Sequence, residues 1–259
     1  MMNKHFTILI ICMAFALSGC KKDKPKEADE QEAPVKLLSK VTEISNGATS
    51  VSTYTYDDKN RMISIKTGST QEIKYSYKSE EIAAIEVRSG NISNNSVFTY
   101  SGGKPVKIIA KSYDGGTLQK EATYSFAYSG ELITDINISE NGVIAQKTKI
   151  KYKDNNIIET ESESNVIIKV VNTYGNKFSR FKDSRQKYYT GAEFFDSFSV
   201  NDLLKAVIIY PDGATLTSTY TYTYDSDGYP ITVSVAHLHS AVGSVGGSTS
   251  TFEYRNGNE

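Results

Sequence analysis

A tyrosine-rich hairpin pattern returns every 21 to 28 residues along most of this 259-residue chain. The clearest copies are YTYDDKNRMISI, at residues 54–65, and YTYTYDSDGYPITVSV, at residues 220–235. Self-similarity at a steady interval is the signature of a fold built from repeated units. The period can be counted on the last aromatic residue of successive copies, which are Tyr56, Tyr77, Tyr100, Tyr128, Tyr152 and Tyr174.

Each copy contains two segments in which large apolar side chains occupy alternate positions. In the first copy, Tyr54 and Tyr56 flank a threonine, and Ile63 and Ile65 flank a serine. A period of two places alternate side chains on one face of a β-strand, as in a sheet with one buried and one solvated face. Two strands per copy, in about eight or nine copies, predict an all-β fold: an antiparallel meander of roughly 16 to 18 strands, rolled into a barrel-like single sheet.

Short polar turns separate the predicted strands. Asp57–Asn60 and Asp225–Gly228 lie within copies, whereas Ser89–Asn91 and Glu140–Gly142 lie between them. Asn, Asp and Gly tolerate the positive φ angles that tight hairpins require. With connections this short, sequential strands are expected to pair as antiparallel neighbours.

The first twenty residues predict export. Lys4 precedes an apolar stretch from Phe6 to Leu17, which is too short to span a bilayer. The LSGC sequence at residues 17–20 resembles the lipobox of a bacterial lipoprotein signal peptide. The resemblance implies cleavage before Cys20 and a diacylglycerol on its sulfur, so that residues 1–19 are the signal peptide and Cys20 contacts the membrane through lipid. The alternative is a buried or free cysteine after an ordinary signal.

A charged segment with proline near both ends, KKDKPKEADEQEAP, follows Cys20. It holds almost nothing apolar to bury, and we expect residues 20–35 to form a disordered tether. Residues 36–259 are then one repeat-built β domain, because the repeat never pauses for a linker. Lys21 stands where an Asp would mark inner-membrane retention, which favours an outer-membrane address. The early charges after Cys20 resemble the signals that send some Bacteroidota lipoproteins to the cell surface, and this resemblance implies surface exposure.

The charge of the chain argues against a nucleic-acid partner. Without residues 1–19 the chain carries 28 basic and 30 acidic residues, a formal charge of −2. Binding to nucleic acid requires a basic face, which a nearly neutral chain does not predict.

One segment, Asn172–Asn201, breaks the alternation and mixes basic with aromatic residues. One interpretation is a loop that caps the open end of a rolled sheet. The other is a ligand-binding loop, since long loops in compact domains are often functional. Arginine would bind carboxylate or phosphate, and aromatic rings would stack on sugars. The candidate ligand-binding residues are Arg180, Arg185, Tyr188, Tyr189, Phe194 and Phe195.

Motifs that carry catalysis or bind cofactors are almost absent. His237 and His239 are spaced to face one side of a strand, but they are half a metal site without further ligands, and packed or solvated histidines are the plainer interpretation. The sequence has no G-x-S-x-G motif and no phosphate-binding loop. Asp57 and Asp225 sit at turns, where they have backbone roles. We expect no metal, no cofactor and no enzymatic activity.

At YTYDDKNRMISI and YTYDSDGYPITV the chain resembles the YD repeat of RHS-type proteins, with Asn60-Arg61 and Gly228-Tyr229 at the Gly-Arg position of that repeat. The lipobox, the charged tether and residues 199–233 together are similar to an uncharacterised family of Bacteroidota lipoproteins with a porin-like β fold. The likeness covers roughly residues 36–259. It implies a rolled β-sheet and assigns no catalytic residues.

The sequence does not predict a membrane-spanning porin. Strands of membrane barrels need about 9 to 11 residues with apolar side chains facing lipid, whereas the alternating runs here span mostly about five to eight. We expect the tyrosine and isoleucine faces to line the interior of a soluble sheet. Three functions fit: a non-catalytic binding or interaction lipoprotein for a glycan or an envelope protein, a structural envelope protein, or a hydrolase whose carboxylates meet only in the fold.

Overall fold

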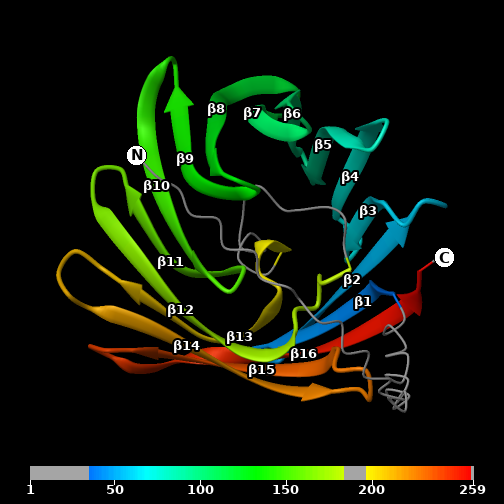
Figure 1. Ribbon diagram of the computed structural model, residues 1–259, viewed down its shortest axis with the longest axis vertical. Helices are drawn as coiled ribbons and strands as arrows, with labels where there is room; N and C mark the ends of the chain where they lie inside the picture. Colours follow the sequence, from blue (N-terminus) through cyan, green and yellow to red (C-terminus); the bar gives the residue numbers. More distant parts are fainter. Residues whose placement is uncertain (1–34, 184–196, 258–259) are drawn as a thin grey trace, which may run out of the picture. The chain divides into compact units, whose positions relative to one another are not determined.

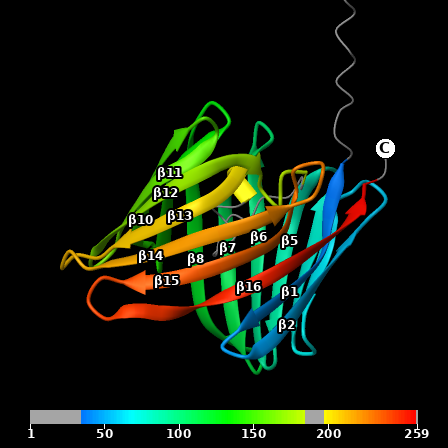
Figure 2. The same cartoon turned by 90° about the horizontal axis from the view of Figure 1, so that it is seen from below.

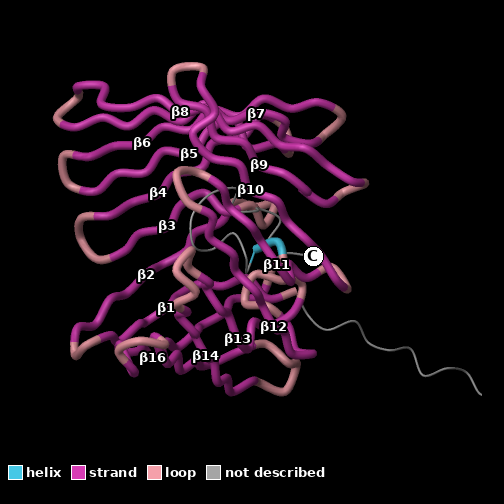
Figure 3. Tube along the Cα trace, turned by 90° about the vertical axis from the view of Figure 1, so that its left-hand side faces the viewer, coloured by secondary structure: helices cyan, strands magenta, loops and turns pink. Residues whose placement is uncertain are grey.

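The computed structural model describes residues 35–183 and 197–257, which fold almost entirely into β-strands (Figure 1, Figure 3). No helix among these residues is long and apolar enough to cross a membrane. The strands are β1 (Lys36–Ser45), β2 (Ala48–Tyr56), β3 (Met62–Thr67), β4 (Gln71–Lys78), β5 (Glu81–Ser89), β6 (Ile92–Ser101), β7 (Lys104–Asp114), β8 (Thr117–Ser129), β9 (Leu132–Glu140), β10 (Val143–Lys153), β11 (Asn156–Glu163), β12 (Ile167–Phe178), β13 (Asn201–Ile209), β14 (Thr215–Tyr224), β15 (Pro230–His239) and β16 (Gly243–Asn256).

The sixteen strands form one closed antiparallel barrel. Each strand pairs with its neighbours in sequence, and β1 pairs with β16 from Lys36↔Asn256 to Ser45↔Ser248. The first strand (blue) therefore lies beside the last (red) in Figure 1. The predicted meander of hairpins is confirmed, and the strand count falls at the lower end of the predicted range.

The apolar side chains of the repeats fill the interior of the barrel. Isoleucines and aromatic residues from strands all around the sheet belong to one buried cluster, which is possible only if they point inward. Phe181, from the connection between β12 and β13, packs into the same cluster and is 2% exposed. The prediction that tyrosines and isoleucines line the interior of the sheet is thus confirmed for the described residues.

A ring of eight β-bulges fixes one end of the barrel. In each repeat the last tyrosine of an even-numbered strand pairs with a residue at the start of the next odd-numbered strand, and the residue that follows this partner is left unpaired. Bulges of this kind bend and twist a strand, as closing a sheet requires. The pairs are Tyr56 with Met62, Tyr77 with Ile82, Tyr100 with Pro105, Tyr128 with Ile133, Tyr152 with Ile157, Tyr174 with Leu203, Tyr224 with Pro230 and Tyr254 with Leu38.

The hydroxyl groups of these tyrosines link each repeat to the one before it. Six of the eight form a hydrogen bond with the backbone of the residue that pairs with the preceding tyrosine of the ring. Tyr77, for example, donates to the carbonyl of Met62, the partner of Tyr56, at 2.6 Å. Tyr224 donates instead to Asp202 Oδ2 at 2.5 Å, and the buried Tyr152 hydroxyl has no hydrogen-bond partner within residues 35–183 and 197–257. We call these eight tyrosines the tyrosine ring. Burial raises the pKa of Tyr100 and of Tyr128 to about 12.

The outward face of the barrel is polar. Lys151 follows the inward-facing Ile150, and its Nζ lies 2.7 Å from Oε1 of Glu159, whose Oε2 lies 2.7 Å from Lys169. Lys111 with Glu121, at 3.0 Å, forms a further ion pair between neighbouring strands. This sidedness is the reverse of a membrane barrel, where an apolar band faces lipid and the lumen is polar.

Two expectations about element lengths were wrong. Strand lengths run from six residues in β3 to 14 in β16, and thirteen of the sixteen strands have nine residues or more. The alternating apolar runs underestimated them because inward positions change from apolar to serine, threonine and asparagine before the strand ends. The loop expected over residues 172–201 is also shorter, because β12 continues to Phe178.

The two ends of the barrel carry different hairpin turns (Figure 2). The tyrosine ring lies at the end that also holds the beginning of β1, the end of β16 and the connection between β12 and β13; we call it the closed end. We call the opposite end the rim. Its eight turns, which join each odd-numbered strand to the next strand, are residues 46–47, 68–70, 90–91, 115–116, 141–142, 164–166, 210–214 and 240–242.

Candidate functional site

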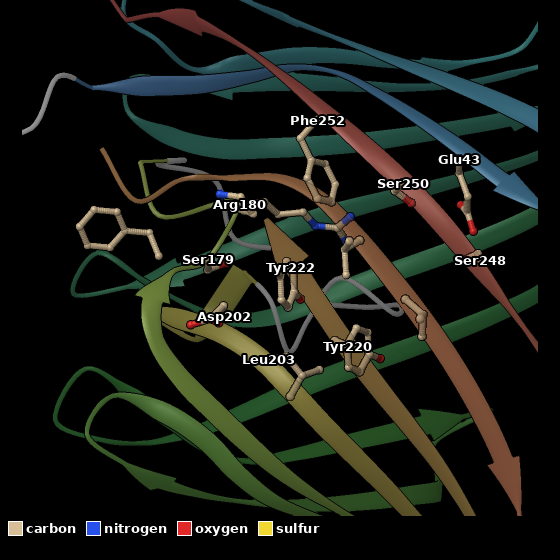
Figure 4. Close-up of a pocket in the computed structure, with 14 residues that line it drawn as sticks. Glu43, Ser179, Arg180, Asp202, Leu203, Tyr220, Tyr222, Ser248, Ser250 and Phe252 are labelled. Carbon is tan, nitrogen blue, oxygen red and sulfur yellow. The ribbon is translucent and has the colours of Figure 1, made fainter. Parts of the chain in front are cut away.

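A cavity of about 180 Å³ lies inside the barrel, against β13 to β16 and β1 (Figure 4). Its wall combines aromatic rings, hydroxyl groups, two carboxylates and one guanidinium. The lining residues that carry this chemistry are Glu43, Ser179, Arg180, Asp202, Tyr220, Tyr222, Ser248, Ser250 and Phe252.

Alternation along three adjacent strands places the wall. Tyr220 and Tyr222 are inward residues of β14, and their rings lie side by side with centroids 6.5 Å apart and planes 13° apart. Two strands away, Ser248 and Ser250 are inward residues of β16. Small hydroxyl side chains at these positions leave room beside the rings of β14. The cavity therefore lies where the inward serines of β16 come near the inward tyrosines of β14.

Arg180 reaches into the cavity from the connection after β12. Its guanidinium lies 4.9 Å from the ring centroid of Phe181 and 5.6 Å from that of Phe252, the cation–π geometry of a partly desolvated arginine (Figure 4). Among the residues predicted to bind a ligand, Arg180 is the one that the structure places in this cavity. A guanidinium held over aromatic faces suits the recognition of an oxygen-rich ligand.

Asp202 lines the cavity but has a structural role. Its side chain is 3% exposed, and it accepts hydrogen bonds from the Lys177 backbone at 2.9 Å and from the Tyr224 hydroxyl at 2.5 Å. Burial and the hydrogen bond to Asp202 raise the pKa of Tyr224 above its usual value. A Cβ on Gly175 would stand 2.6 Å from the Asp202 oxygens, so glycine is required there. Asp202 thus holds the end of β12 through the Lys177 amide. It also accepts the Tyr224 hydroxyl bond that a backbone carbonyl accepts from most other tyrosines of the ring.

A group of polar contacts, which we call the polar clamp, holds the start of the β12–β13 connection; its residues are Lys36, Asp183, Asp225, Asp227 and Tyr229. Asp183 accepts hydrogen bonds from the Lys36 backbone amide at 2.9 Å and from the Tyr229 hydroxyl. Lys36 Nζ pairs with Asp225 at 2.7 Å and with Asp227 at 2.5 Å, and these hydrogen bonds raise the pKa of Lys36. The clamp joins the first strand, the β14–β15 turn and the segment that carries Arg180.

The two histidines of β15 contact polar groups of neighbouring residues. His237 Nδ1 lies 2.8 Å from the hydroxyl of Ser218 on the neighbouring strand, and His239 accepts a hydrogen bond from the Ala241 amide. Within residues 35–183 and 197–257, no group of three or more His, Cys, Asp and Glu side chains is placed to hold a metal ion. Both histidines therefore have packing roles on β15.

The remaining predicted site residues lie outside the described residues. They are Cys20, Arg185, Tyr188, Tyr189, Phe194 and Phe195.

Sequence reasoning did not find Glu43, Ser248 and Ser250, and it assigned Tyr220 and Tyr222 only to the repeated core. The one signal present was not specific to this strand: β16 reads GSVGGSTSTFEYRN, and serine also stands at the corresponding inward positions of β2. A local loss of bulk on an inward face is what an internal cavity requires.

Comparison with known proteins supports the fold. No protein-family model matches the chain, and no curated protein matches it. Among solved structures it is similar to a porin-like protein from Bacteroides uniformis, with 15% identity and a TM-score of 0.59 over 84% of this chain and 96% of that one. A porin-like protein from Bacteroides vulgatus is also similar, with 15% identity and a TM-score of 0.54 over 85% of this chain and 99% of that one. The barrel fold is thus shared with porin-like proteins of Bacteroides.

Proposed function

We propose that this chain is a non-catalytic binding lipoprotein, held at the outer membrane by lipid on Cys20, that takes a glycan in the barrel cavity. The observation that carries the proposal is the pairing of the Tyr220 and Tyr222 rings with the hydroxyls of Ser248 and Ser250 across one cavity. Sugars are bound by stacking on aromatic faces and by hydrogen bonds to their hydroxyls. At about 180 Å³ the cavity suits one sugar ring rather than a drug-sized ligand.

The polar outer face supports an aqueous location for the barrel. Ion pairs such as Lys111 with Glu121 would be costly in contact with acyl chains. An anchor outside the barrel would hold the protein at a membrane while the barrel wall stays in water, and the LSGC sequence at residues 17–20 offers one. Two or more acyl chains would hold the protein stably, whereas one would not.

The absence of enzymatic activity is part of this proposal. Glu43 and Asp202 both line the cavity, as the hydrolase hypothesis requires of two carboxylates. Both oxygens of Asp202, however, accept structural hydrogen bonds. These contacts assign the Asp202 side chain to the structure of the barrel rather than to a reaction.

Glycan binding is tested with a Tyr222→Leu variant. Loss of the stacking face is expected to lower affinity for the sugar found on a glycan array at least tenfold, by titration calorimetry. Thr221→Ala, on the outward face of the same strand, is the matched control and should bind as the native protein does. Equal binding by Tyr222→Leu, with its circular dichroism unchanged, would exclude this cavity. Absence of any bound sugar would leave a structural role in the envelope as the better interpretation.

The lipid anchor is tested separately with Cys20→Ser. In a host grown with radioactive palmitate, the native chain is expected to carry label and to sediment with the outer membrane, whereas the variant should be unlabelled. Mass spectrometry of the native protein should find a mature chain that begins at residue 20. Label that persists in Cys20→Ser would place the lipid elsewhere.

A further inference from the structure

The rim carries a ring of exposed aliphatic side chains. Fifteen large apolar side chains of the described residues are exposed, and ten of them lie in a rim turn or within three residues of one. They come from six of the eight rim hairpins. These residues are Ile44, Ile92, Leu118, Val143, Ile144, Val166, Ile167, Leu238, Val242 and Val245.

The exposure is large where the chain turns. Val143 is 70% exposed and Val242 is 72% exposed, although β-branched residues are normally among the most buried. Neither residue is required by its turn, which would favour Asn, Asp or Gly. Tyr210 stands in the turn between β13 and β14, one of the two hairpins without such an aliphatic residue. Tyrosine is enriched where proteins meet a membrane surface.

We propose that the rim is a membrane-docking surface whose hairpin tips enter the headgroup region of a lipid bilayer. Apolar residues on six hairpins surround the opening of the barrel at the rim. Only a surface as broad as this opening can cover all of them at once. A bilayer offers such a surface, whereas a globular partner would cover one side. Apolar side chains bind this boundary in proportion to the area that they bury there.

Charge does not provide the attraction. Lys66, just before a rim turn, lies 3.6 Å from Glu72, and Lys120, just after one, lies 2.7 Å from Glu140. With these lysines compensated, docking is expected to depend on apolar contact, and therefore to occur on zwitterionic lipid and to resist salt.

The length of chain before the barrel permits this orientation, which rests on the lipid anchor proposed above. Residues 21–34 are 14 residues and span at most ~50 Å when extended. The ten residues of β1 span about 34 Å from the closed end to the rim. A lipid on Cys20 can therefore lie in the same membrane as the one that the rim contacts.

The test uses a chain that begins at Lys21, which carries no lipid and retains all sixteen strands. Flotation with phosphatidylcholine vesicles measures the bound fraction in 0.1 and 1 M salt. The rim variant is Val143→Ser, Ile144→Ser and Val242→Ser. The matched control changes three exposed aliphatic residues at the closed end, as Val35→Ser, Ile63→Ser and Ile231→Ser.

The native chain and the closed-end control are expected to float with the vesicles at both salt concentrations, and the rim variant to partition at least tenfold less. Native protein that stays in solution, or a rim variant that floats equally, would overturn the proposal. Dimers in sedimentation that the rim variant loses, without flotation, would assign the rim to a second copy of the chain. Because no lipid is attached, none of these results depends on Cys20 or on glycan binding.

Discussion

Raising the pH above 10 is expected to destabilise the barrel progressively, and the loss of stability is expected to continue beyond pH 12. The neutral form of each buried tyrosine is favoured in the folded state because burial penalises the phenolate, so the folded pKa lies above the ordinary value of about 10. A raised folded pKa contributes stability that is fully present below the unfolded pKa and is lost as the pH rises through the folded pKa. Burial is the main cause in every case, and the tyrosines affected are Tyr56, Tyr77, Tyr100, Tyr124, Tyr128, Tyr152, Tyr224, Tyr229 and Tyr254.

The measurement combines tyrosinate absorbance near 295 nm with circular dichroism between pH 8 and 13. Because the pKa of Tyr100 and of Tyr128 is about 12, the two signals should change together between pH 10 and 12. Tyr128→Phe removes one ionisable tyrosine and is expected to shift this transition to higher pH. Because it also removes one hydrogen bond, its unfolding free energy at pH 7 is measured first, and the shift is compared after this difference is subtracted. Tyrosines that ionise near pH 10 while the dichroism stays unchanged would contradict the prediction.

Gly247→Ala is expected to destabilise the barrel by about 3 kcal/mol. A Cβ at this position would stand 2.2 Å from the carbonyl oxygen of Val235 and 3.4 Å from Cα of Ala236. These are backbone atoms of β15, so the two strands must separate to admit even one methyl group. They pair at a register shift, where Ala236 stands opposite Gly247. The free energy of unfolding is measured by urea denaturation at pH 7.

Thr249→Ala is the matched control for this prediction. Thr249 lies two residues further along β16, on the exposed outward face, and its substitution should change the unfolding free energy by less than about 0.5 kcal/mol. An equal effect of the two substitutions would mean that β15 and β16 separate at little cost at Gly247.

Much of the fold could be predicted because each hairpin repeats the same residues for the same physical reason. The last tyrosine of each copy belongs to the tyrosine ring, and the turn that follows it needs Asn, Asp or Gly. These residues therefore recur in the sequence at regular intervals. Tyr224 comes 50 residues after Tyr174, because the β12–β13 connection interrupts the period. The ends of the strands could not be predicted, because inward serine and threonine residues look like loop residues when only the sequence is read.

Less of the candidate site could be predicted, because it depends on register and closure. Arg180 stood out as a basic residue among aromatic ones, but its position over Phe252 depends on where β16 lies in the closed barrel. Ser248 faces inward only because of its register with Val235 and Ser45. A shift of one residue would turn it outward, and no local pattern of small polar residues fixes that register.

The pairing of β1 with β16 has a consequence for how the chain folds. β1 has no partner on its free edge until β16, the last 14-residue strand, is available. Before that moment the growing sheet has two unpaired edges, which are templates for aggregation. The closing contact joins the most distant strands in the sequence, and contacts of this kind form slowly. The chain is therefore open to aggregation until its final strand pairs with β1.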